Sequence, residues 1–550
     1  MPTLNWIGKD AVLKHHKEVP FRLLEPVPEL SCPDSLTGSD SENLIVQGDN
    51  LLALKALLPR YAGQVKCIYI DPPYNTGEEG GDGKGWTYND NVNSPEIRRW
   101  LGKTVNKEGE DLSRHDKWLC MMYPRIVLLK EFLARDGLIF ISMDESEICA
   151  LRFMLEEIFG RNRYLATFVW KSRRNKDSRH LSNVSVDHEY VVCFHGGHGR
   201  LRGTEIDENK YANPDNDPRG AWMSDNLVGL ATKDRRPNLH YDLIDPSTKI
   251  NYGCPEKGYR YSKETMNQKI IEGRILWPAK STGRPRHKKF MAELGSEHTG
   301  FSTFIECGNT NEGTEAVRDI LGENLFMFPK PPSLIQELIR QMVDKNALVM
   351  DSFAGSGTTA HSVLKQNAED GGNRRFILVE MDNNIATNVT AERVKRVSQG
   401  YANAKGVQVE GLGGGFQFCR LSNEPLFKAD GPIRSDVTFD QLAEFVWFME
   451  TGTGLALSDL PKRKKRTPFL GMYKDRAVFL LYNGILKDKS DTGGNVLNNR
   501  TLEILANALP KHEGNRVVYG ARSRFDKAKL AKLGISFHQL PYELAVKTWF

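Results

Sequence analysis

The feature that most constrains the fold of this chain is a four-residue motif, Asp71-Pro72-Pro73-Tyr74, that directly follows an apolar segment. Residues 65–70 (Val-Lys-Cys-Ile-Tyr-Ile) predict a buried strand, because short apolar runs bounded by turn residues are typical of covered strands. The prolines lock φ and so fix the direction of the backbone carbonyls in the turn. The motif therefore predicts a strand whose carboxyl end presents a carboxylate, a rigid turn and an aromatic ring.

These groups suit methyl transfer to an amine conjugated to a ring, such as the exocyclic nitrogen of adenine. The lone pair of that nitrogen is delocalised into the ring, so the amine is a poor nucleophile. Accepting hydrogen bonds from its two N–H groups localises the lone pair. Asp71 can accept one, and a carbonyl of Pro72 or Pro73 can accept the other. Tyr74 can stack on a base rotated out of the duplex. The alternative interpretation is a plain Pro-Pro turn after a strand.

A second strand end lies far downstream. Residues 348–351 are apolar up to Asp351 and run into a glycine-containing turn with Gly355 and Gly357, after which a helical pattern begins at Thr358. Glycine allows a tight turn and a close approach of a ligand to the backbone, and a helix start offers free N–H groups. A third strand over 375–380 ends in Glu380, where an acid can hold two ribose hydroxyls.

The glycine turn by itself is ambiguous, because Gly355-x-Gly357-x-x-Ala360 also fits a dinucleotide-binding turn. Together with the first motif it favours S-adenosylmethionine instead. The methionine ammonium of that molecule needs an acceptor, and Asp351 is the candidate. A helix-capping or turn role for Asp351 is the alternative.

These motifs resemble the β class of DNA adenine amino-methyltransferases, in which the catalytic motif precedes the cofactor motif. More narrowly, the chain resembles the modification (Mod) subunits of type III restriction systems and their stand-alone relatives. The resemblance extends over about residues 43–400. Further matching segments are 48–54, 74–77, 115–118, 137–144, 213–220 and 329–331.

The resemblance implies roles for single residues. Asp71 would polarise the target amine with Pro72 and Pro73, and Tyr74 would stack on the base. Phe353, Gly355, Gly357 and Thr358 would surround the cofactor, and Glu380 would bind its ribose. Lys330, followed by Pro331, resembles the motif that packs by the methionine moiety. An ordinary helix start is the alternative for that segment, since proline favours the first turn.

Two clusters of basic residues are candidate DNA contacts. The first lies within 161–180 and the second lies at 284–289, which Gly283 and Pro285 predict to be a loop. Such side chains can neutralise phosphates, and a solvated surface is the alternative. The candidates are Arg173, Arg174, Lys176, Arg179, Arg284, Arg286 and Lys288. A third basic string, 462–466, is interpreted as a flexible loop.

Composition excludes several other classes of protein. The eight cysteines form no Cys-x-x-Cys pair, so we expect no metal site and mostly buried, reduced thiols. No apolar run approaches a membrane span, and the N-terminus lacks a signal-peptide pattern. We therefore expect a cytoplasmic, nucleoid-associated protein. The net charge of +5 is too small to attract DNA globally, so local patches must do so.

The predicted fold class is α/β: a permuted Rossmann-like methyltransferase fold with an inserted target-recognition domain and a small C-terminal α/β domain. The predicted domains are an arm (1–42), a catalytic half (43–171), a recognition domain (172–320), a cofactor-binding half (321–410) and a C-terminal domain (411–550). Glycines at 411–415 are interpreted as the hinge into the last of these. Residues 78–93 are a loop that either closes over a flipped base or simply lies on the surface.

The periodicity of apolar residues predicts the order of strands and helices. The expected strands are 66–70, 138–142, 165–171, 188–194, 347–351 and 375–380, and the expected helices are 50–58, 118–134, 146–159, 358–365 and 385–398. Two α/β blocks separated by an insert suggest one shared sheet. That arrangement requires strand 347–351 to lie beside strand 66–70, so that both motifs meet at one edge.

We therefore expect an S-adenosylmethionine-dependent enzyme that methylates adenine N6 in specific duplex DNA. A homodimer and a restriction (helicase-nuclease) subunit are the expected protein partners. The alternatives are methylation of cytosine N4 or of RNA adenine, and a recognition subunit that guides a restriction partner. Asp71 at the first motif position favours adenine, because the cytosine enzymes usually carry serine there.

Overall fold

The computed structural model describes residues 3–34, 41–75, 114–176, 183–323, 325–428, 433–455, 460, 466–485 and 487–540. The chain forms two compact units. One comprises Met1–Arg202 with Ser302–Phe550, and the other is Gly203–Phe301.

The first unit contains a ten-stranded sheet in the order β1-β17-β2-β14-β13-β3-β4-β6-β5-β12. The strands from β17 to β4 run parallel, whereas β1 and β6 are antiparallel to their neighbours. Their bounds are β1 Arg22–Pro26, β17 Gln417–Pro425, β2 Leu44–Gln47, β14 Arg375–Glu380, β13 Leu348–Asp351, β3 Val65–Ile70, β4 Leu133–Met143, β6 Glu189–His195, β5 Tyr164–Trp170 and β12 Phe304–Ile305.

The predicted neighbourhood of the two motif strands is confirmed. Strand β13 pairs in parallel with β3, with Val349 opposite Cys67 and Met350 opposite Ile68. Because the carboxyl ends of parallel strands lie at one edge of a sheet, the turn after β3 and the bend after β13 emerge side by side. Two segments nearly three hundred residues apart thus contribute to one sheet.

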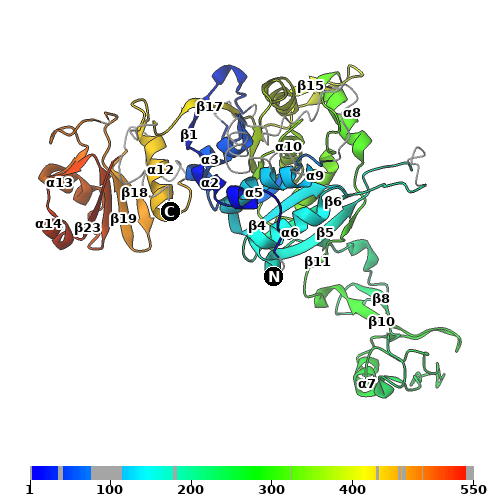
Figure 1. The fold of residues 1–550 in the computed structure, drawn as a ribbon. Coiled ribbons are helices and arrows are strands. Elements are labelled where there is room, and N and C mark those ends of the chain that lie inside the picture. Colours follow the sequence, from blue (N-terminus) through cyan, green and yellow to red (C-terminus); the bar gives the residue numbers. More distant parts are fainter. Residues whose placement is uncertain are drawn as a thin grey trace. The chain divides into compact units, whose positions relative to one another are not determined.

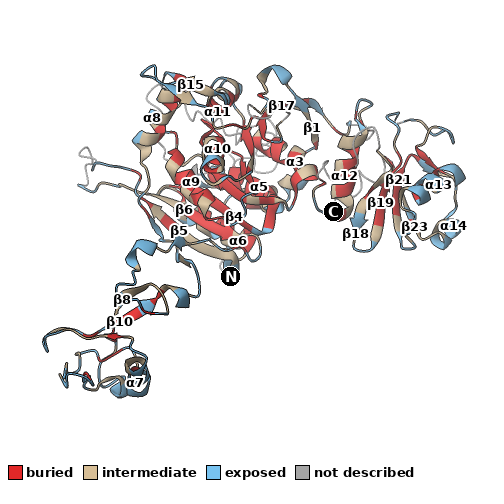
Figure 2. Ribbon diagram, turned by 180° about the vertical axis from the view of Figure 1, so that it is seen from behind, coloured by how far each residue is buried: buried red, intermediate tan, exposed pale blue. Residues whose placement is uncertain are grey.

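Helices cover this sheet, and most of the buried residues lie in its strands and on the helix sides that pack against it (Figure 2). The helices α3 (Asn50–Tyr61), α5 (Arg114–Phe132) and α6 (Ile148–Phe159) pack together with one set of alternating strand residues. Asp49 caps α3, since its carboxylate accepts from the N–H of Leu52 at the start of the helix.

A second group of helices contains α9 (Pro332–Arg340), α10 (Thr358–Asp370) and α11 (Glu392–Gln399), with α10 against β14 (Figure 1). The strand residues that alternate with the first set, such as Val349 and Phe376, are also fully buried. Both faces of the central strands are therefore covered, which explains why those strands are almost continuously apolar. The helix expected over 385–398 begins as a π-helical segment, η7 (Ile385–Ala391).

The predicted N-terminal arm and the predicted glycine hinge both differ from the structure. The segment predicted as an arm contains α1 (Lys9–Val12), α2 (His15–Glu18), η1 (Pro28–Leu30) and β1. Strand β1 lies at the edge of the main sheet, where it pairs with β17. The glycines predicted as a hinge precede β17, which still belongs to the main sheet. A Cβ at Gly415 would lie 2.3 Å from the Cys32 carbonyl oxygen, so this glycine permits a close backbone approach.

The C-terminal part of this unit begins after β17. It holds α12 (Phe439–Thr451) and a four-stranded sheet in the order β18-β19-β21-β23. The strands and helices of this part bear out the small C-terminal α/β fold that the sequence predicts. The remaining bounds are β18 Phe469–Tyr473, β19 Arg476–Leu480, β20 Val496–Leu497, α13 Asn499–Ala508, β21 Arg516–Gly520, β22 Arg522–Ser523, α14 Lys527–Lys532 and β23 Ile535–Gln539. The other elements of the first unit are η3 Arg161–Arg163, α8 Thr310–Leu321, β15 Gly400–Ala402 and β16 Gln408–Glu410.

The second unit, Gly203–Phe301, is narrower than the recognition domain predicted over 172–320. The difference arises because β6, β12 and α8 on either side of it belong to the first unit. A small core of Leu227, Leu243, Tyr259, Met266 and Ile275 holds it together. Its elements are β7 Thr204–Glu205, η4 Glu208–Lys210, β8 Trp222–Asn226, η5 Pro237–Leu239, α7 Lys263–Ile271, β9 Ile275–Leu276, β10 Arg286–Phe290, η6 Met291–Glu293 and β11 His298–Thr299.

Two compositional findings complete the fold. Within the described part of the chain, no helix has the length and apolarity needed to cross a membrane. Five of the eight cysteines are buried, which confirms the expectation that most of them are.

Candidate active site

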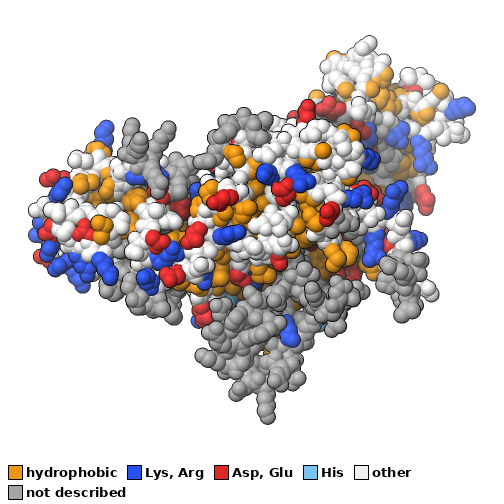
Figure 3. Space-filling model, turned by 90° about the horizontal axis from the view of Figure 1, so that it is seen from above, with side chains coloured by type: hydrophobic (Ala, Val, Ile, Leu, Met, Phe, Trp, Pro, Cys, Tyr) orange, Lys and Arg blue, Asp and Glu red, His pale blue; other side chains and the backbone are white. Residues whose placement is uncertain are grey.

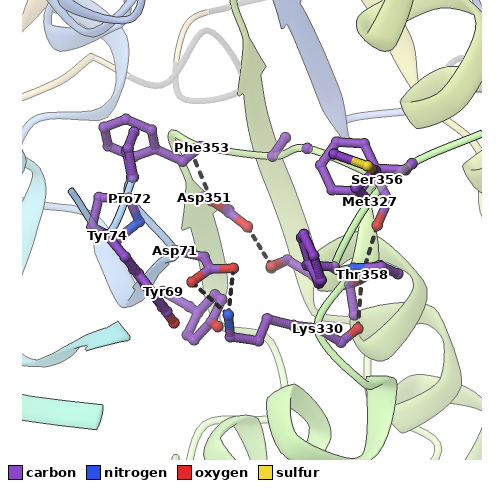
Figure 4. A pocket seen from close by; sticks show the side chains of 17 residues that line it. Tyr69, Asp71, Pro72, Tyr74, Met327, Lys330, Asp351, Phe353, Ser356 and Thr358 are labelled. Atoms are coloured by element: carbon purple, nitrogen blue, oxygen red, sulfur yellow. Dashed lines mark hydrogen bonds and ion pairs between the residues drawn. The ribbon is translucent and has the colours of Figure 1, made fainter. Parts of the chain in front are cut away.

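A cavity of about 240 Å³ lies where the carboxyl ends of β3 and β13 meet (Figure 4). Three segments form its walls: the end of β3 with its turn, residues 326–330 before α9, and the bend between β13 and α10. Of the predicted site residues, the structure brings together Asp71, Pro72, Pro73, Tyr74, Lys330, Asp351, Phe353, Gly355 and Thr358.

Asp71 follows the last residue of β3 and faces the cavity. Its carboxylate oxygens each lie 2.9 Å from the ammonium of Lys330, and its side chain remains 24% exposed. Burial raises the pKa of Asp71, and the charge of Lys330 opposes that rise. Asp71 is thus a carboxyl group that a ligand in the cavity can reach, and the neighbouring Lys330 ammonium favours its ionised form.

The proline turn is held rigidly from behind. The indole N–H of the buried Trp118 donates to the Pro73 carbonyl at 2.7 Å. Asn75 adopts a left-handed φ of 61° and donates through its amide to Glu147, which also hydrogen-bonds His115. Among the described residues no donor bonds to the Pro72 carbonyl, so this acceptor is left for a ligand.

Lys330 lies between two carboxylates. Besides Asp71 it contacts Glu189, at the start of β6, with 3.3 Å between its ammonium and the Glu189 carboxylate. Burial lowers the pKa of Lys330, but the charges of Asp71 and Glu189 more than offset this and raise it overall. The Tyr74 hydroxyl donates to Glu189 at 2.9 Å, and the Lys330 ammonium lies 4.7 Å from the centre of the Tyr74 ring.

Glu189 was not predicted from the sequence, and Lys330 was expected beside the cofactor rather than on the catalytic carboxylate. The sequence feature that could have pointed to Glu189 is its position as an acid at the start of the apolar segment 189–194, which forms β6. Only the antiparallel pairing of β6 with β4 brings that residue toward the turn after β3.

Asp351 ends β13 and organises the glycine bend. Its carboxylate accepts the N–H of Phe353 at 3.0 Å and the hydroxyl of Thr359 at 2.5 Å. Burial raises its pKa to about 7. The two interpretations from the sequence are therefore compatible, since Asp351 holds the turn and also lines the cavity.

Glu380 and Gly357 are not among the described residues that line the cavity, although both belong to the structure around the bend. The Glu380 carboxylate accepts the N–H of Gly355 at 2.8 Å and that of Asp382 at 2.9 Å. Burial raises the pKa of Glu380 to about 7. Ribose binding by Glu380 stays a prediction, and its observed role is to fix the backbone of the bend.

A buried arginine that the sequence did not single out supports the same bend. Arg393 on α11 donates to the Ser356 hydroxyl at 2.8 Å and to the Thr358 hydroxyl at 2.9 Å. The Thr358 hydroxyl in turn donates to the Lys330 carbonyl at 3.1 Å. Burial lowers the pKa of Arg393 to about 10. The bend and the Lys330 segment are therefore parts of one hydrogen-bonded assembly.

The candidate DNA contacts have different environments. Arg173, Arg174 and Lys176 are exposed in the first unit, and Arg284 and Arg286 are exposed in the second, where Arg286 starts strand β10 instead of the predicted loop. On the face shown in Figure 3, basic and acidic side chains are interspersed.

Lys288 is a correction to the predicted set. It is 7% exposed, and its ammonium pairs with Asp215 and, at 3.1 Å, with Asp217. Its charge is therefore used inside the second unit and does not face solvent. Arg179, the loop 78–93 and residues 462–465 of the third basic string lie outside the described residues. Arg466 of that string pairs with Asp440.

Among the described residues, no group of three or more His, Cys, Asp or Glu side chains could hold a metal ion.

Comparison with known proteins gives a consistent picture. Residues 65–392 match the family model described as DNA methylase (N6_N4_Mtase). The chain is 32% identical over 415 residues to the type III restriction-modification enzyme StyLTI Mod subunit of Salmonella typhimurium. The aligned region covers 71% of this chain and 60% of that protein.

Two further relatives are informative. The chain is 28% identical to the EcoP15I Mod subunit of Escherichia coli, over 69% of this chain and 64% of that protein. It is also 28% identical to the type II methyltransferase M.KpnI of Klebsiella pneumoniae, over 70% of this chain and 94% of that protein. The chain thus spans less than two thirds of the length of these Mod subunits.

Proposed function

The chain belongs to the DNA methylase family, and on that premise we propose that it transfers a methyl group from S-adenosylmethionine to the N6 amine of adenine in a specific duplex DNA site. The observation that carries the proposal is the shared cavity, in which the Asp71 turn faces the glycine bend. Asp71 as the first residue of the motif favours adenine over cytosine.

The residues of the cavity fit S-adenosylmethionine. The Asp351 carboxylate suits an ammonium group, and the aromatic ring of Phe353 and the Ser356 and Thr358 hydroxyls complete the wall. Gly355, with φ of 49°, brings the backbone close to the cavity. When bound, S-adenosylmethionine supplies an electrophilic methyl group on a sulfonium. Asp351, Phe353, Gly355 and Thr358 would hold it, with Glu380 at its ribose.

The chain's own residues would prepare the amine. Asp71 accepts one N–H of the extruded adenine and the Pro72 carbonyl accepts the other, which localises the nitrogen lone pair. Tyr74 stacks on the base. The Trp118 hydrogen bond to Pro73 holds the turn that carries these acceptors. As the N–C bond forms and the S–C bond breaks, the nitrogen loses one proton, and Asp71 is the base in contact with it.

The biological setting is proposed from the relatives. Similarity to Mod subunits of type III restriction-modification enzymes supports a role beside a restriction (helicase-nuclease) subunit. A cytoplasmic location and a second copy of this chain as a further partner belong to the same proposal. Coverage of 94% of M.KpnI supports the alternative of a solitary methyltransferase. The second unit, Gly203–Phe301, is the candidate for target recognition.

The test is methylation of unmodified bacterial DNA by the purified full chain with labelled S-adenosylmethionine. We expect label in N6-methyladenine at one short sequence motif, identified by hydrolysis with mass spectrometry and by sequencing that reports modified bases. Label in N4-methylcytosine, or label in RNA only, would replace the proposed substrate with one of the alternatives. Specific DNA binding without any methyl transfer would favour the recognition-subunit alternative.

Cofactor binding is expected to weaken in acid. Burial raises the pKa of Asp351 and of Glu380 to about 7, so both carboxylates take up protons as the pH falls through this value. A protonated Asp351 no longer attracts the ammonium group. The dissociation constant for S-adenosylmethionine should then rise by up to about tenfold per pH unit for each proton taken up. Calorimetric titration from pH 8.5 to 6 measures it. Asp351→Asn should flatten the dependence, and a pH-independent affinity of the wild type would contradict the expectation.

A further inference from the structure

The Lys330 ammonium has two carboxylate partners in one small space. It lies 2.9 Å from both oxygens of Asp71 and 3.3 Å from Glu189. The side chains are 10% exposed for Lys330 and 17% for Glu189. One buried cation is therefore shared by two acids that come from different strands.

This sharing creates a competition during the proposed reaction. Asp71 must offer an oxygen to the target amine, yet in the structure the Lys330 ammonium donates to its Oδ2 and lies equally close to its Oδ1, which is buried and has no hydrogen-bond partner among the described residues. A buried ammonium that loses its partner is strongly destabilised, so Lys330 can leave Asp71 only toward another acid. Glu189, with its carboxylate 3.3 Å from the Lys330 ammonium, is within reach.

We propose that Glu189 is a positioning residue of the methyl transfer, which takes over the Lys330 ammonium when the target amine binds Asp71. This inference rests on the proposed function. Glu189 also accepts the Tyr74 hydroxyl at 2.9 Å, while the Tyr74 ring lies under the Lys330 ammonium. Stacking of the base on Tyr74 and transfer of Lys330 from Asp71 are thereby coupled through one carboxylate.

The charges around Asp71 set the direction of the pH effects. Lys330 lowers the pKa of Asp71 and Glu189 raises it. Asp351 and the phenols of Tyr69 and Tyr74 also face Asp71, and Tyr69 is bonded through its hydroxyl to Ser142 at 2.8 Å. Because activity needs the ionised carboxylate, the acid limb of the rate profile follows the pKa of Asp71.

Two substitutions should move that limb in opposite directions. Glu189→Gln removes a negative charge beside Asp71, so the limb moves to lower pH, while kcat on the plateau falls by about tenfold or more because Lys330 stays on Asp71. Lys330→Met removes the positive charge, so the limb moves to higher pH. Tyr74→Phe keeps the ring but removes the bond to Glu189, and should leave the limb in place.

The experiment measures kcat against pH for the full chain and these variants on bacterial DNA. Glu145→Gln is the matched control, since Glu145 is an exposed acid that bonds Tyr190, next to Glu189, and it should behave like the wild type. Thermal unfolding and S-adenosylmethionine binding confirm that each variant is folded. The opposite shifts would support the proposal.

Two results would overturn the proposal. The first is a Glu189→Gln variant with wild-type kcat and an unmoved acid limb of the rate profile. The second is an equal loss of kcat in Glu189→Gln and Tyr74→Phe with unmoved acid limbs, which would mean that Glu189 only supports Tyr74. A double-mutant cycle of Lys330 and Glu189 on the free energy of unfolding tests the pair without turnover. A coupling of zero overturns this inference, whereas a wild type that transfers no methyl group overturns the proposed function instead.

Discussion

Asp71→Asn should abolish methyl transfer while leaving the protein folded, with kcat reduced by about 10³-fold or more, at the upper end of what removing one preorganised polar group costs. Asparagine preserves the shape of the side chain but replaces one of the two carboxylate oxygens with an N–H₂ group and removes the negative charge. It can no longer accept the amine hydrogen bond as a charged group or take up the proton that the nitrogen releases. The affinity for S-adenosylmethionine should change by less than about threefold, since Asp351 and the glycine bend are untouched.

Asp136→Asn is the matched control for this substitution. Asp136 also pairs with a lysine, Lys66 at 2.6 Å, and it lies in β4 beside the opposite end of β3. Exposed pairs of this kind contribute little to stability, so this variant should retain wild-type kcat. Single-turnover measurements with labelled methyl donor separate the two variants. Near-full activity in Asp71→Asn would show that the carboxylate is not the acceptor and would remove the basis of the proposed mechanism.

The parts of the site that could be predicted are those encoded locally. The Asp71-Pro72-Pro73-Tyr74 turn and the bend with Gly355 and Gly357 each need particular residues within a few positions, because φ must be locked in one and positive in the other. The adjacency of β3 and β13 followed from a general rule for parallel sheets, and the structure confirms it.

The parts that could not be predicted depend on long-range pairing. Glu189 reaches Lys330 only because β6 folds back along β4, and Arg393 reaches Ser356 only because α11 packs behind the bend. Likewise Lys288 looked like a free cation, and only the fold of the second unit shows that Asp217 neutralises it. The periodicity of apolar residues predicts which face of a helix or strand is buried. It does not predict which distant residue packs against that face.

The glycine bend makes a second large effect predictable. Gly357→Val should weaken S-adenosylmethionine binding, because Gly357 has φ of 78° and its Cβ would meet Thr390 at 3.3 Å. A β-branched residue is a strong outlier at positive φ. The bend can shift to relieve this strain of about 1–3 kcal/mol. Cofactor binding must then return the bend to its strained conformation, which lowers the affinity by about 5- to 150-fold. Ser356 and Thr358, which flank Gly357, would move with it.

Gly371→Val separates this effect from general strain. Gly371 ends α10, the helix that Gly357 begins, and has a similar φ of 65°, but nothing lies within 4 Å of its Cβ position and it is far from the cavity along the helix. Both variants carry the same backbone penalty and should lose similar amounts of thermal stability. Only Gly357→Val should lose cofactor affinity, as measured by calorimetry. If both variants bound S-adenosylmethionine equally well, the bend would not be the element that holds it, and the cavity at the end of β13 would need another ligand.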